Sequence, residues 1–293
     1  MSEKLFSETS NDNTLFITGC CNNHCLMCCQ PPHMCDDYDY CYKKNLEIIK
    51  NSPSNIKCIG LTGGEPTMAG GYLFKTLKAI REKYPDTLLH FLTNGRLFNE
   101  EVLTELKKYN FENIVFAVPL HADFRGDHDT IAGVTGAYSE TMQGLYNLAK
   151  AHARIELRII INAINFSRLP NIADFIHYNL PFVEDVVFVG MEAIGFAVKN
   201  ANVVWIDPYD YREKLADAIL CLARWGYEVG VSNIPHCLLP PSIYEFAWQS
   251  ISDWKVYYPE FCTSCCYRNV CCGVFATSYW QSPNLRPIMC DGR

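Results

Sequence analysis

Three cysteines near the start of the chain have types and spacing that suit iron chemistry. They stand as Cys21-x3-Cys25-x2-Cys28 and are called the N-terminal triad below. Three thiolates hold a four-iron cluster while one iron stays open for a ligand that is not protein. An open iron lets a cluster deliver an electron into a bound molecule, so this spacing indicates catalysis more than scaffolding.

Two more cysteines, Cys20 and Cys29, flank the N-terminal triad. Only the triad satisfies both intervals, so we expect the flanking pair to be core or spare thiols. The competing interpretation is a zinc site, which usually needs four nitrogen or sulfur ligands. Its fourth ligand would be His24, Cys29 or Cys35.

A second pattern, Gly63-Gly64-Glu65-Pro66, follows an apolar run. Taken by itself it would be a turn after a strand. The glycines would also let the backbone approach a cofactor closely, and the carboxylate could pair with an ammonium group.

Composition limits the possible classes of protein. The chain has 293 residues, of which 49% are hydrophobic, enough for one large α/β domain or about two ordinary ones. Its net charge of -7, without a run of Lys and Arg, argues against nucleic acid as a partner. The start is polar and no apolar run approaches the roughly 20 residues of a membrane span, so we expect a cytoplasmic protein with no membrane partner. In that compartment, 16 cysteines indicate metal ligands or catalytic thiols before disulfides.

Short β-rich runs alternate with helical patterns. The expected strands are 15–18, 58–61, 88–92, 114–118, 155–161 and 186–189. The expected helices begin near Asp39, Gly71, Glu100, Gly136, Pro170 and Pro208. The last of these has Asp207 as its N-cap and a core-facing stripe of Tyr211, Leu215, Ile219 and Leu222.

Strict β-α alternation implies an α/β fold with parallel strands, either a partial (β/α)6 TIM-like barrel or an open doubly wound sheet. Polar residues cluster just after the strand ends, where a barrel has its site, so the partial barrel is favoured. These residues are Gly63 to Glu65, Thr93, Asn94, His121, Asp123 and Glu192.

The pattern changes after Gly230 into a segment rich in Pro, aromatic residues and Cys. We therefore expect a barrel domain over 1–230 and a small metal-stapled module over 231–293. The module offers Cys262-x2-Cys265-x5-Cys271 with Cys237 upstream, called the C-terminal cysteine set below. A zinc knuckle is the alternative. The ligand choice stays open to three neighbouring thiols: Cys266, Cys272 and Cys290.

The N-terminal triad after a first strand, followed by the 63–66 loop after a second, resembles the radical S-adenosylmethionine superfamily. The resemblance implies that the triad holds a 4Fe-4S cluster and that S-adenosylmethionine chelates its fourth iron. It also implies that the 63–66 loop binds the amino group of the cofactor. Reductive cleavage would then yield a 5'-deoxyadenosyl radical that abstracts a substrate hydrogen.

The resemblance extends to further cofactor contacts. Met27 stands where this superfamily commonly has an aromatic residue against the adenine, and a thioether can fill that place. Thr93, Asn94, Arg158 and Glu192 could reach the ribose or carboxylate of the cofactor, although a turn residue or an ion pair would explain them equally. The string from His121 to Asp129 offers acid and base groups, or else a solvated polar loop.

The C-terminal cysteine set resembles the twitch or SPASM module of peptide-modifying radical enzymes. Four thiolates suffice for one auxiliary 4Fe-4S cluster, and Phe275 stands where a full SPASM module continues with another cysteine. A single auxiliary cluster is therefore expected. It could accept an electron from the substrate or ligate the substrate directly.

Motifs in order along the chain resemble one subfamily, the HxsC-type maturases of the His-Xaa-Ser peptide system. They are CNNHCLMC, LTGGEPT, FLTNGR, GMEAIGFAVKN, WIDPYDY and SISDWK. The resemblance implies a peptide or small-protein substrate, a second radical enzyme as partner, and an electron donor such as flavodoxin or ferredoxin. Only 20 residues precede Cys21, so substrate recognition is expected from a partner or from the C-terminal module. A radical enzyme acting on a small molecule or nucleotide, and a zinc-stabilised binding or scaffold protein, are the alternatives.

Overall fold

The structure is a computed structural model that describes residues 5–10, 12–32 and 37–290. The chain forms two compact units. The first contains residues 1–24, 30–119 and 133–156, and the second contains 25–29, 120–132 and 157–293. These units are defined by contacts in the fold, whereas the expected boundary at residue 230 was based on a change of sequence pattern. That boundary stays a prediction.

The first unit is built on parallel strands in sequence order: β1 (Thr14–Phe16), β2 (Cys58–Thr62), β3 (Leu88–Leu92) and β4 (Ile114–Pro119). Strand β5 (Arg154–Ile160) begins in this unit and ends in the second. In β2 and β3 fully buried residues alternate with half-buried ones, as a period of two requires. Strand β4 is buried along nearly its whole length, the pattern of a parallel strand covered on both faces.

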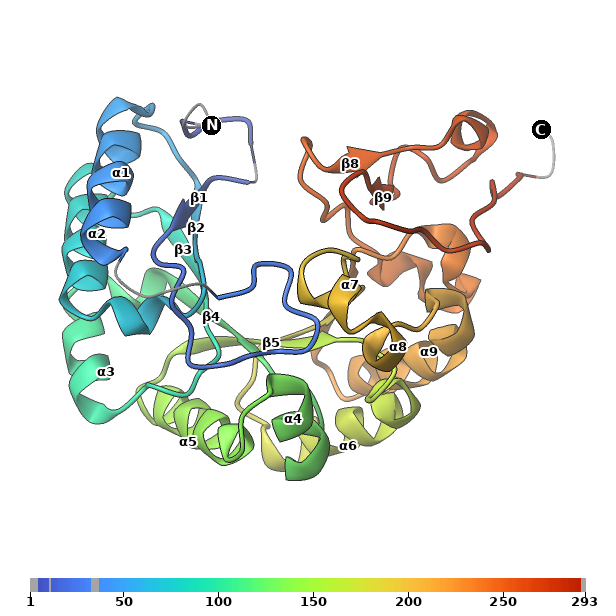
Figure 1. Ribbon diagram of the computed structural model, residues 1–293, viewed down its shortest axis with the longest axis horizontal. Coiled ribbons are helices and arrows are strands. Elements are labelled where there is room, and N and C mark those ends of the chain that lie inside the picture. Colours follow the sequence, from blue (N-terminus) through green and yellow to red (C-terminus); the bar gives the residue numbers. More distant parts are fainter. Residues whose placement is uncertain (1–4, 11, 33–36, 291–293) are drawn as a thin grey trace. The chain divides into compact units, whose positions relative to one another are not determined.

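Helices of the first unit cover its strands. They are α1 (Tyr38–Asn51), α2 (Gly71–Lys83), α3 (Glu100–Leu106) and α5 (Ala137–Lys150). Figure 1 shows α1 and α2 side by side next to the first strands, and the two helices pack together. Phenylalanine rings fill the core of this unit, with the Phe98 and Phe116 centroids 5.2 Å apart in an edge-to-face arrangement.

The second unit continues the parallel sheet with β6 (Asp185–Val189) and β7 (Glu228–Ser232), so that the strand order is β1 to β7. Its helices are α4 (Arg125–Ala132), α6 (Leu169–Asn179), α7 (Phe196–Lys199), α8 (Ala201–Val204) and α9 (Pro208–Arg224). Helix α6 packs against α9. The expected apolar stripe on α9 is confirmed, because all four of its members are buried.

Asp207 caps α9 as expected, since its side chain accepts a hydrogen bond from the Tyr209 amide at 2.8 Å. After β7 the chain forms a small antiparallel pair, β8 (Val256–Tyr257) and β9 (Val274–Phe275). The C-terminal cysteine set lies around this pair, with Cys237 and Cys262 in short 3-10 helices and Cys265 and Cys271 in irregular segments.

The predicted α/β class is confirmed, with all six expected strands present. The sequence pattern missed β7, because we ended the regular region at Gly230, in the middle of that strand. It also missed α4, whose polar segment 125–129 was taken as a loop or a catalytic string. Among the described residues, no helix has the length and apolar character needed to cross a membrane.

Candidate active site and a second cysteine cluster

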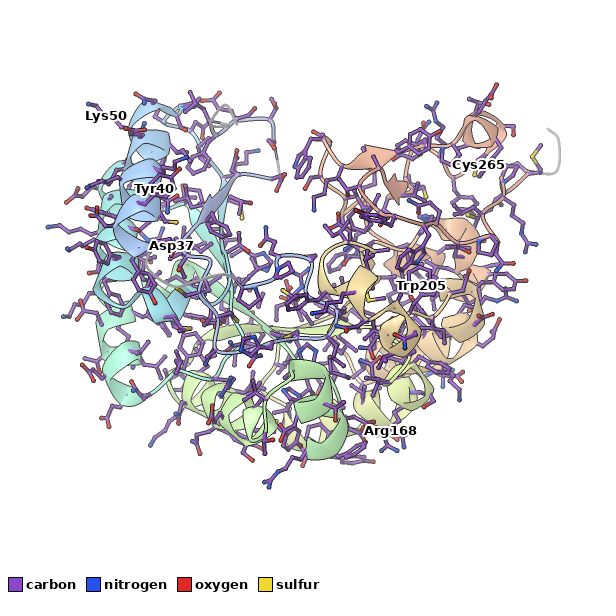
Figure 2. All side chains as sticks on the ribbon, viewed as in Figure 1. Asp37, Tyr40, Lys50, Arg168, Trp205 and Cys265 are labelled. Atoms are coloured by element: carbon purple, nitrogen blue, oxygen red, sulfur yellow. A yellow bond between two sulfur atoms is a disulfide. The ribbon has the colours of Figure 1, made fainter. Side chains whose placement is uncertain are left out.

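The 63–66 loop of the first unit is hydrogen-bonded to the residues that precede Cys21. The Gly64 amide donates to the Thr18 carbonyl at 2.7 Å, and the Glu65 amide donates to the Cys20 carbonyl at 2.6 Å. Asp37, labelled in Figure 2, fixes the same stretch, because its carboxylate accepts from the Gly19 amide at 2.6 Å and from the Thr18 hydroxyl at 2.5 Å. Residues 18–20 and 63–66, which are distant in the sequence, thus form one local structure.

This contact explains the two glycines. A Cβ on Gly64 would lie 2.1 Å from the Cys20 carbonyl oxygen, and one on Gly63 would lie 2.2 Å from the Thr18 carbonyl oxygen. Gly63 also has a φ of +148°, which L side chains rarely adopt. We expected the glycines to allow approach to a cofactor, whereas the close approach that the structure shows is to the backbone of the chain itself.

Glu65 is fully buried and accepts four hydrogen bonds. Its Oε1 accepts from the Thr67 amide at 3.1 Å, the Thr67 hydroxyl at 2.6 Å and the Thr93 hydroxyl at 2.7 Å, and its Oε2 accepts from the Asn94 amide at 2.6 Å. Burial raises the pKa of Glu65, and the four donors oppose that rise. Pro66 follows as the first residue of a short 3-10 helix, where its missing N–H costs nothing.

The carboxylate of Glu65 therefore holds Thr93 and Asn94, which follow β3, against the 63–66 loop. Asn94 in turn faces the N-terminal triad, with its Nδ2 3.9 Å from the Cys21 Sγ and 2.5 Å from the Asn22 Oδ1. The structure thus brings together five predicted site residues of the first unit: Cys21, Gly64, Glu65, Thr93 and Asn94.

The surroundings of Cys21 fit a thiolate that binds iron. Its Sγ accepts from the Asn23 amide at 3.4 Å in addition to the Asn94 contact, and N–H donors to sulfur are a usual means of tuning iron–sulfur clusters. Burial raises the pKa of the free thiol, so in this setting a bound metal would be needed to keep it deprotonated at neutral pH.

Arg96 is a structural residue of the site that the sequence interpretation did not single out, although it ends the quoted FLTNGR motif. Its guanidinium donates to the Asn22 carbonyl and, at 2.6 Å, to the Asn23 Oδ1. Glu140 on α5 holds the other side of the guanidinium through contacts of 2.7 and 2.8 Å. No sequence pattern indicates this role of Arg96. It follows from the contacts of Arg96 with Asn22 and Asn23 in the fold.

The rest of the N-terminal triad belongs to the second unit, where Cys25–Cys29 is fixed by helix ends. The Leu26 amide donates to the Ile131 carbonyl at the end of α4, at 2.9 Å. The Phe196 amide, at the start of α7, donates to the Cys28 carbonyl at 2.9 Å, and the Asn200 side chain donates to the Leu26 carbonyl at 2.8 Å. The quoted GMEAIGFAVKN motif therefore supports the cysteine loop.

Met27 is buried in an apolar cluster with Ile131, Ala197 and Val204. This packing secures the loop, and a contact between Met27 and an adenine ring stays a prediction. Of the two cysteines that flank the triad, Cys20 is buried and takes part in a disulfide, while Cys29 is exposed. Cys35, considered above as a zinc ligand, lies outside the described residues.

His121 and His128 are the buried polar members of the 121–129 string. The Nε2 of His121 lies 3.9 Å from the Cys25 Sγ, and burial together with His128 holds the pKa of His121 well below its usual value. Asp123 instead pairs with Arg168, with a distance of 2.8 Å from Nε to Oδ1. The solvated-loop interpretation is wrong for the two histidines, because α4 and Asn165 enclose them.

Glu192 and Arg158 have other surroundings. The Glu192 carboxylate accepts from Lys255 at 2.9 Å and from the Thr277 hydroxyl, both in the chain after β7. Arg158 lies half-buried in β5, and its carbonyl accepts from the Leu120 amide at 3.0 Å. The Lys255 ion pair gives Glu192 a structural role, so cofactor binding by either residue stays a prediction.

The C-terminal cysteine set lines one pocket. Cys237, Cys262, Cys265 and Cys271 come together there with His236, Arg268 and Arg286. Among the described residues no three His, Cys, Asp or Glu side chains converge on a single metal ion; the four thiols surround the pocket instead. Four thiols around a shared space, with two guanidinium groups nearby, fit an anionic multi-iron cluster.

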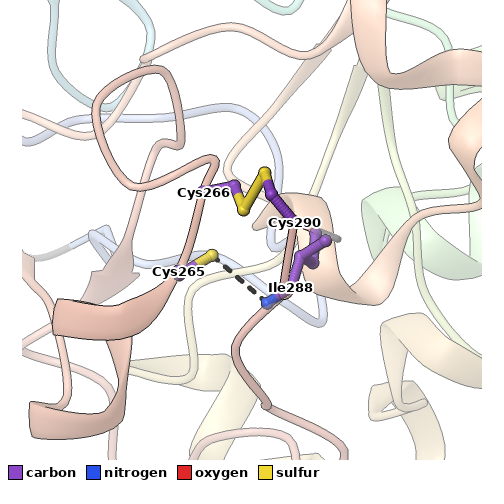
Figure 3. Close-up of a disulfide and its surroundings, with 4 residues drawn as sticks. All are labelled: Cys265, Cys266, Ile288 and Cys290. Atoms are coloured by element: carbon purple, nitrogen blue, oxygen red, sulfur yellow. Dashed lines mark hydrogen bonds between the residues drawn. A yellow bond between two sulfur atoms is a disulfide. The ribbon is translucent and has the colours of Figure 1, made fainter. Parts of the chain in front are cut away.

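Neighbouring thiols take separate roles in this region. Cys266 is bonded to Cys290 in a disulfide, shown in Figure 3 beside Cys265, whose Sγ accepts from the Ile288 amide at 3.3 Å. Cys272 is buried and hydrogen-bonded to Cys271, which lowers the pKa of Cys271 to about 4. Burial raises the pKa of Cys237 to about 11. The arrangement favours Cys237 over Cys290 as the fourth ligand of the set.

Comparison with known proteins places these features in a family. The family model for the radical SAM superfamily matches residues 15–176, more than half of the chain. The chain belongs to the radical SAM superfamily. Membership in that superfamily implies a 4Fe-4S cluster and S-adenosylmethionine as cofactors.

Among curated relatives, the Fe-coproporphyrin III synthase of Methanosarcina barkeri is 29% identical over 115 residues, which are 39% of this chain and 27% of that protein. A Methanocaldococcus jannaschii protein provisionally named a glycyl-radical enzyme activating enzyme is 29% identical over 106 residues, 34% of this chain and 28% of that protein. This chain therefore matches less than a third of the length of each of these two relatives.

Among solved structures, SuiB of Streptococcus suis bound to S-adenosylmethionine has a TM-score of 0.60 at 12% identity, over 75% of this chain and half of SuiB. The enzyme anSMEcpe, solved with S-adenosylmethionine and a peptide, has a TM-score of 0.57 at 14% identity, over 74% of this chain and 62% of that one. These likenesses confirm the predicted fold class, a radical SAM partial TIM-like barrel fold with a Cys-rich C-terminal region.

The first prediction concerns Gly64. In Gly64→Ala the new methyl group would meet the Cys20 carbonyl, so we expect the 63–66 loop to separate from the 18–20 backbone. The free energy of unfolding should fall by about 3 kcal/mol, and the iron content after anaerobic reconstitution should fall with it. Gly71→Ala is the matched control, because nothing lies within 4 Å of the added methyl. Equal melting temperatures for the two variants would contradict the close-contact explanation.

The second prediction concerns metal content. Reconstituted protein should hold about eight irons per chain, and a Cys262→Ala/Cys265→Ala double variant about four. Cys221→Ala, which changes a free thiol on α9 outside both cysteine sets, should keep about eight. About four irons together with one zinc in the wild type would support the zinc-knuckle alternative instead.

Proposed function

We propose that this radical SAM enzyme modifies a peptide or small protein of the His-Xaa-Ser type by hydrogen abstraction. The proposed radical chemistry is supported by the local structure in which the buried Glu65 joins the 63–66 loop to Asn94, which faces Cys21. The proposed peptide substrate is supported by the motifs that resemble the HxsC-type maturases and by the pocket of the C-terminal cysteine set. It is also supported by the likeness to SuiB, which has been solved with its precursor peptide SuiA.

In this proposal the N-terminal triad holds the 4Fe-4S cluster, and its spacing in the chain carries that assignment. When bound, the cluster and S-adenosylmethionine supply a 5'-deoxyadenosyl radical and methionine by one-electron reductive cleavage of the sulfonium. The chain's own residues bind, orient and enclose the reacting groups. Asn94 and the Asn23 amide stabilise the Cys21 thiolate, while the helix ends at Ile131 and Phe196 fix the 25–28 loop.

The carboxylate of Glu65 fixes the loops that surround the cofactor. All four of its hydrogen bonds go to the chain, so we propose that the amino group of the cofactor is bound by carbonyl and hydroxyl oxygens that Glu65 positions. The same proposal includes Thr93, Arg158, Glu192 and Met27 as further cofactor contacts.

The C-terminal cysteine set is proposed to hold an auxiliary 4Fe-4S cluster. Arg268 and Arg286 line the same pocket and would compensate the negative charge of such a cluster. A flavodoxin or ferredoxin is proposed as electron donor, and a second radical SAM protein as partner in recognising the substrate.

A second candidate function keeps the radical chemistry and changes the substrate to a small molecule or nucleotide. It is supported by the partial likeness to the Fe-coproporphyrin III synthase. Membership in the radical SAM superfamily disfavours the third interpretation, a zinc-stabilised scaffold protein.

The third prediction separates the two cysteine sets. Cys25→Ala should abolish formation of 5'-deoxyadenosine from S-adenosylmethionine and dithionite, because only the N-terminal cluster has an open iron. Cys265→Ala should still form 5'-deoxyadenosine but yield no modified product, because the auxiliary cluster acts on the substrate. Equal 5'-deoxyadenosine formation by wild type and Cys25→Ala would refute the assignment of the triad.

The fourth prediction concerns the substrate. A synthetic peptide with His-Xaa-Ser repeats should stimulate cleavage of S-adenosylmethionine and change in mass during anaerobic incubation with cofactor and reductant. The control peptide replaces each His and Ser with Ala and should do neither. If the repeats have no effect on a protein that cleaves the cofactor by itself, the small-molecule candidate becomes the preferred one.

A further inference from the structure

We propose that His121 donates a hydrogen bond from Nε2 to the Cys25 thiolate and thereby raises the reduction potential of the cluster held by the N-terminal triad. This inference rests on the proposed function, in which Cys25 binds iron. It assigns to His121 the role of a positioning residue that acts through Cys25, in place of the acid–base role expected from the sequence.

The geometry supports the contact. Both residues lie in the second unit, with 3.9 Å between Nε2 and Sγ. The backbone of His121 is fixed on both sides, because its amide donates to the His128 Nδ1 at 3.3 Å and its carbonyl accepts from the Asn165 Nδ2 at 2.9 Å. These contacts hold the backbone that carries the imidazole, and Nε2 of the ring faces the sulfur.

Burial decides which nitrogen of His121 carries the proton. The residue is only 2% exposed, and its buried Nδ1 has no hydrogen-bond partner in the described part of the chain. A proton on Nδ1 would leave a buried donor unsatisfied and would direct the lone pair of Nε2 at the lone pairs of sulfur. A proton on Nε2 instead meets an acceptor, so the Nε2–H tautomer is the stable one.

An N–H donor at this place affects electron transfer. Reduction of an iron–sulfur cluster adds negative charge that is shared with its thiolate ligands, so a hydrogen bond to sulfur stabilises the reduced form more than the oxidised form. The effect is strong here because the imidazole is shielded from water. A higher potential lets the cluster take up its electron more readily from the donor, and it lowers the driving force for passing that electron to the sulfonium of S-adenosylmethionine.

The fifth prediction tests this contact by redox titration of the full chain, reconstituted anaerobically and followed by electron paramagnetic resonance. The signal of the N-terminal cluster is identified as the one that changes when S-adenosylmethionine is added. At a fixed potential, His121→Phe should lower the ratio of reduced to oxidised cluster about tenfold, which equals about 59 mV for a one-electron couple. His121→Gln keeps an N–H donor and should shift the ratio less.

His177→Gln is the matched control, because this half-buried histidine stacks on Trp225 with centroids 3.8 Å apart and should leave the ratio unchanged. A second measurement avoids dependence on a folded variant. In the wild type, a nitrogen hyperfine coupling to the reduced cluster should change when histidine is labelled with 15N.

Two failures can be told apart. If His121→Phe keeps its iron and the same potential as the wild type, or if the wild type shows no histidine coupling, the inference about His121 is wrong. If the wild type assembles no cluster that responds to S-adenosylmethionine, the proposed function itself fails.

Discussion

The carboxylate of Glu65 is buried and is stabilised by four hydrogen bonds from Thr67, Thr93 and Asn94. A buried carboxylate is costly unless its oxygens are satisfied, so the loops after β2 and β3 must stay in the one arrangement that supplies these donors. That arrangement in turn directs Asn94 at the Cys21 sulfur. The geometry of the first unit near the triad depends on this single group.

The second unit fixes its share of the triad by another means. Carbonyl groups at the end of a helix and amides at its start have no hydrogen-bond partner within the helix. The 25–28 backbone supplies two such partners: the Leu26 amide bonds to a carbonyl at the end of α4, and the Cys28 carbonyl bonds to the first amide of α7. Met27 adds apolar packing below the loop. A short loop without regular secondary structure is thereby held by backbone hydrogen bonds and apolar packing, the kind of support that a catalytic cluster needs.

The chain after β7 combines a few buried apolar residues, among them Ile234, Leu238 and Ile243, with several cysteine contacts. Its described residues form two strands of two residues each and short 3-10 helices, so regular structure contributes few of its constraints. The pocket of four thiols, the Cys266–Cys290 disulfide and the Glu192–Lys255 ion pair provide the constraints instead. A metal cluster in that pocket would stabilise the folded module directly, because ligand binding and folding are linked.

The local sequence pattern by itself predicted most of the strands and helices and the chemistry of the N-terminal triad. Alternating apolar runs marked the six strands, and Asp207-Pro208 marked the start of α9, because period and capping are properties of neighbouring residues. The spacing of the triad indicated its chemistry for the same reason. Tertiary structure alone decided why Gly63 and Gly64 are required, since the obstructing carbonyls belong to Thr18 and Cys20. It also turned His121 toward Cys25 and Glu192 toward Lys255, because contacts between distant segments depend on how the strands and helices pack and leave no periodic signal in the sequence.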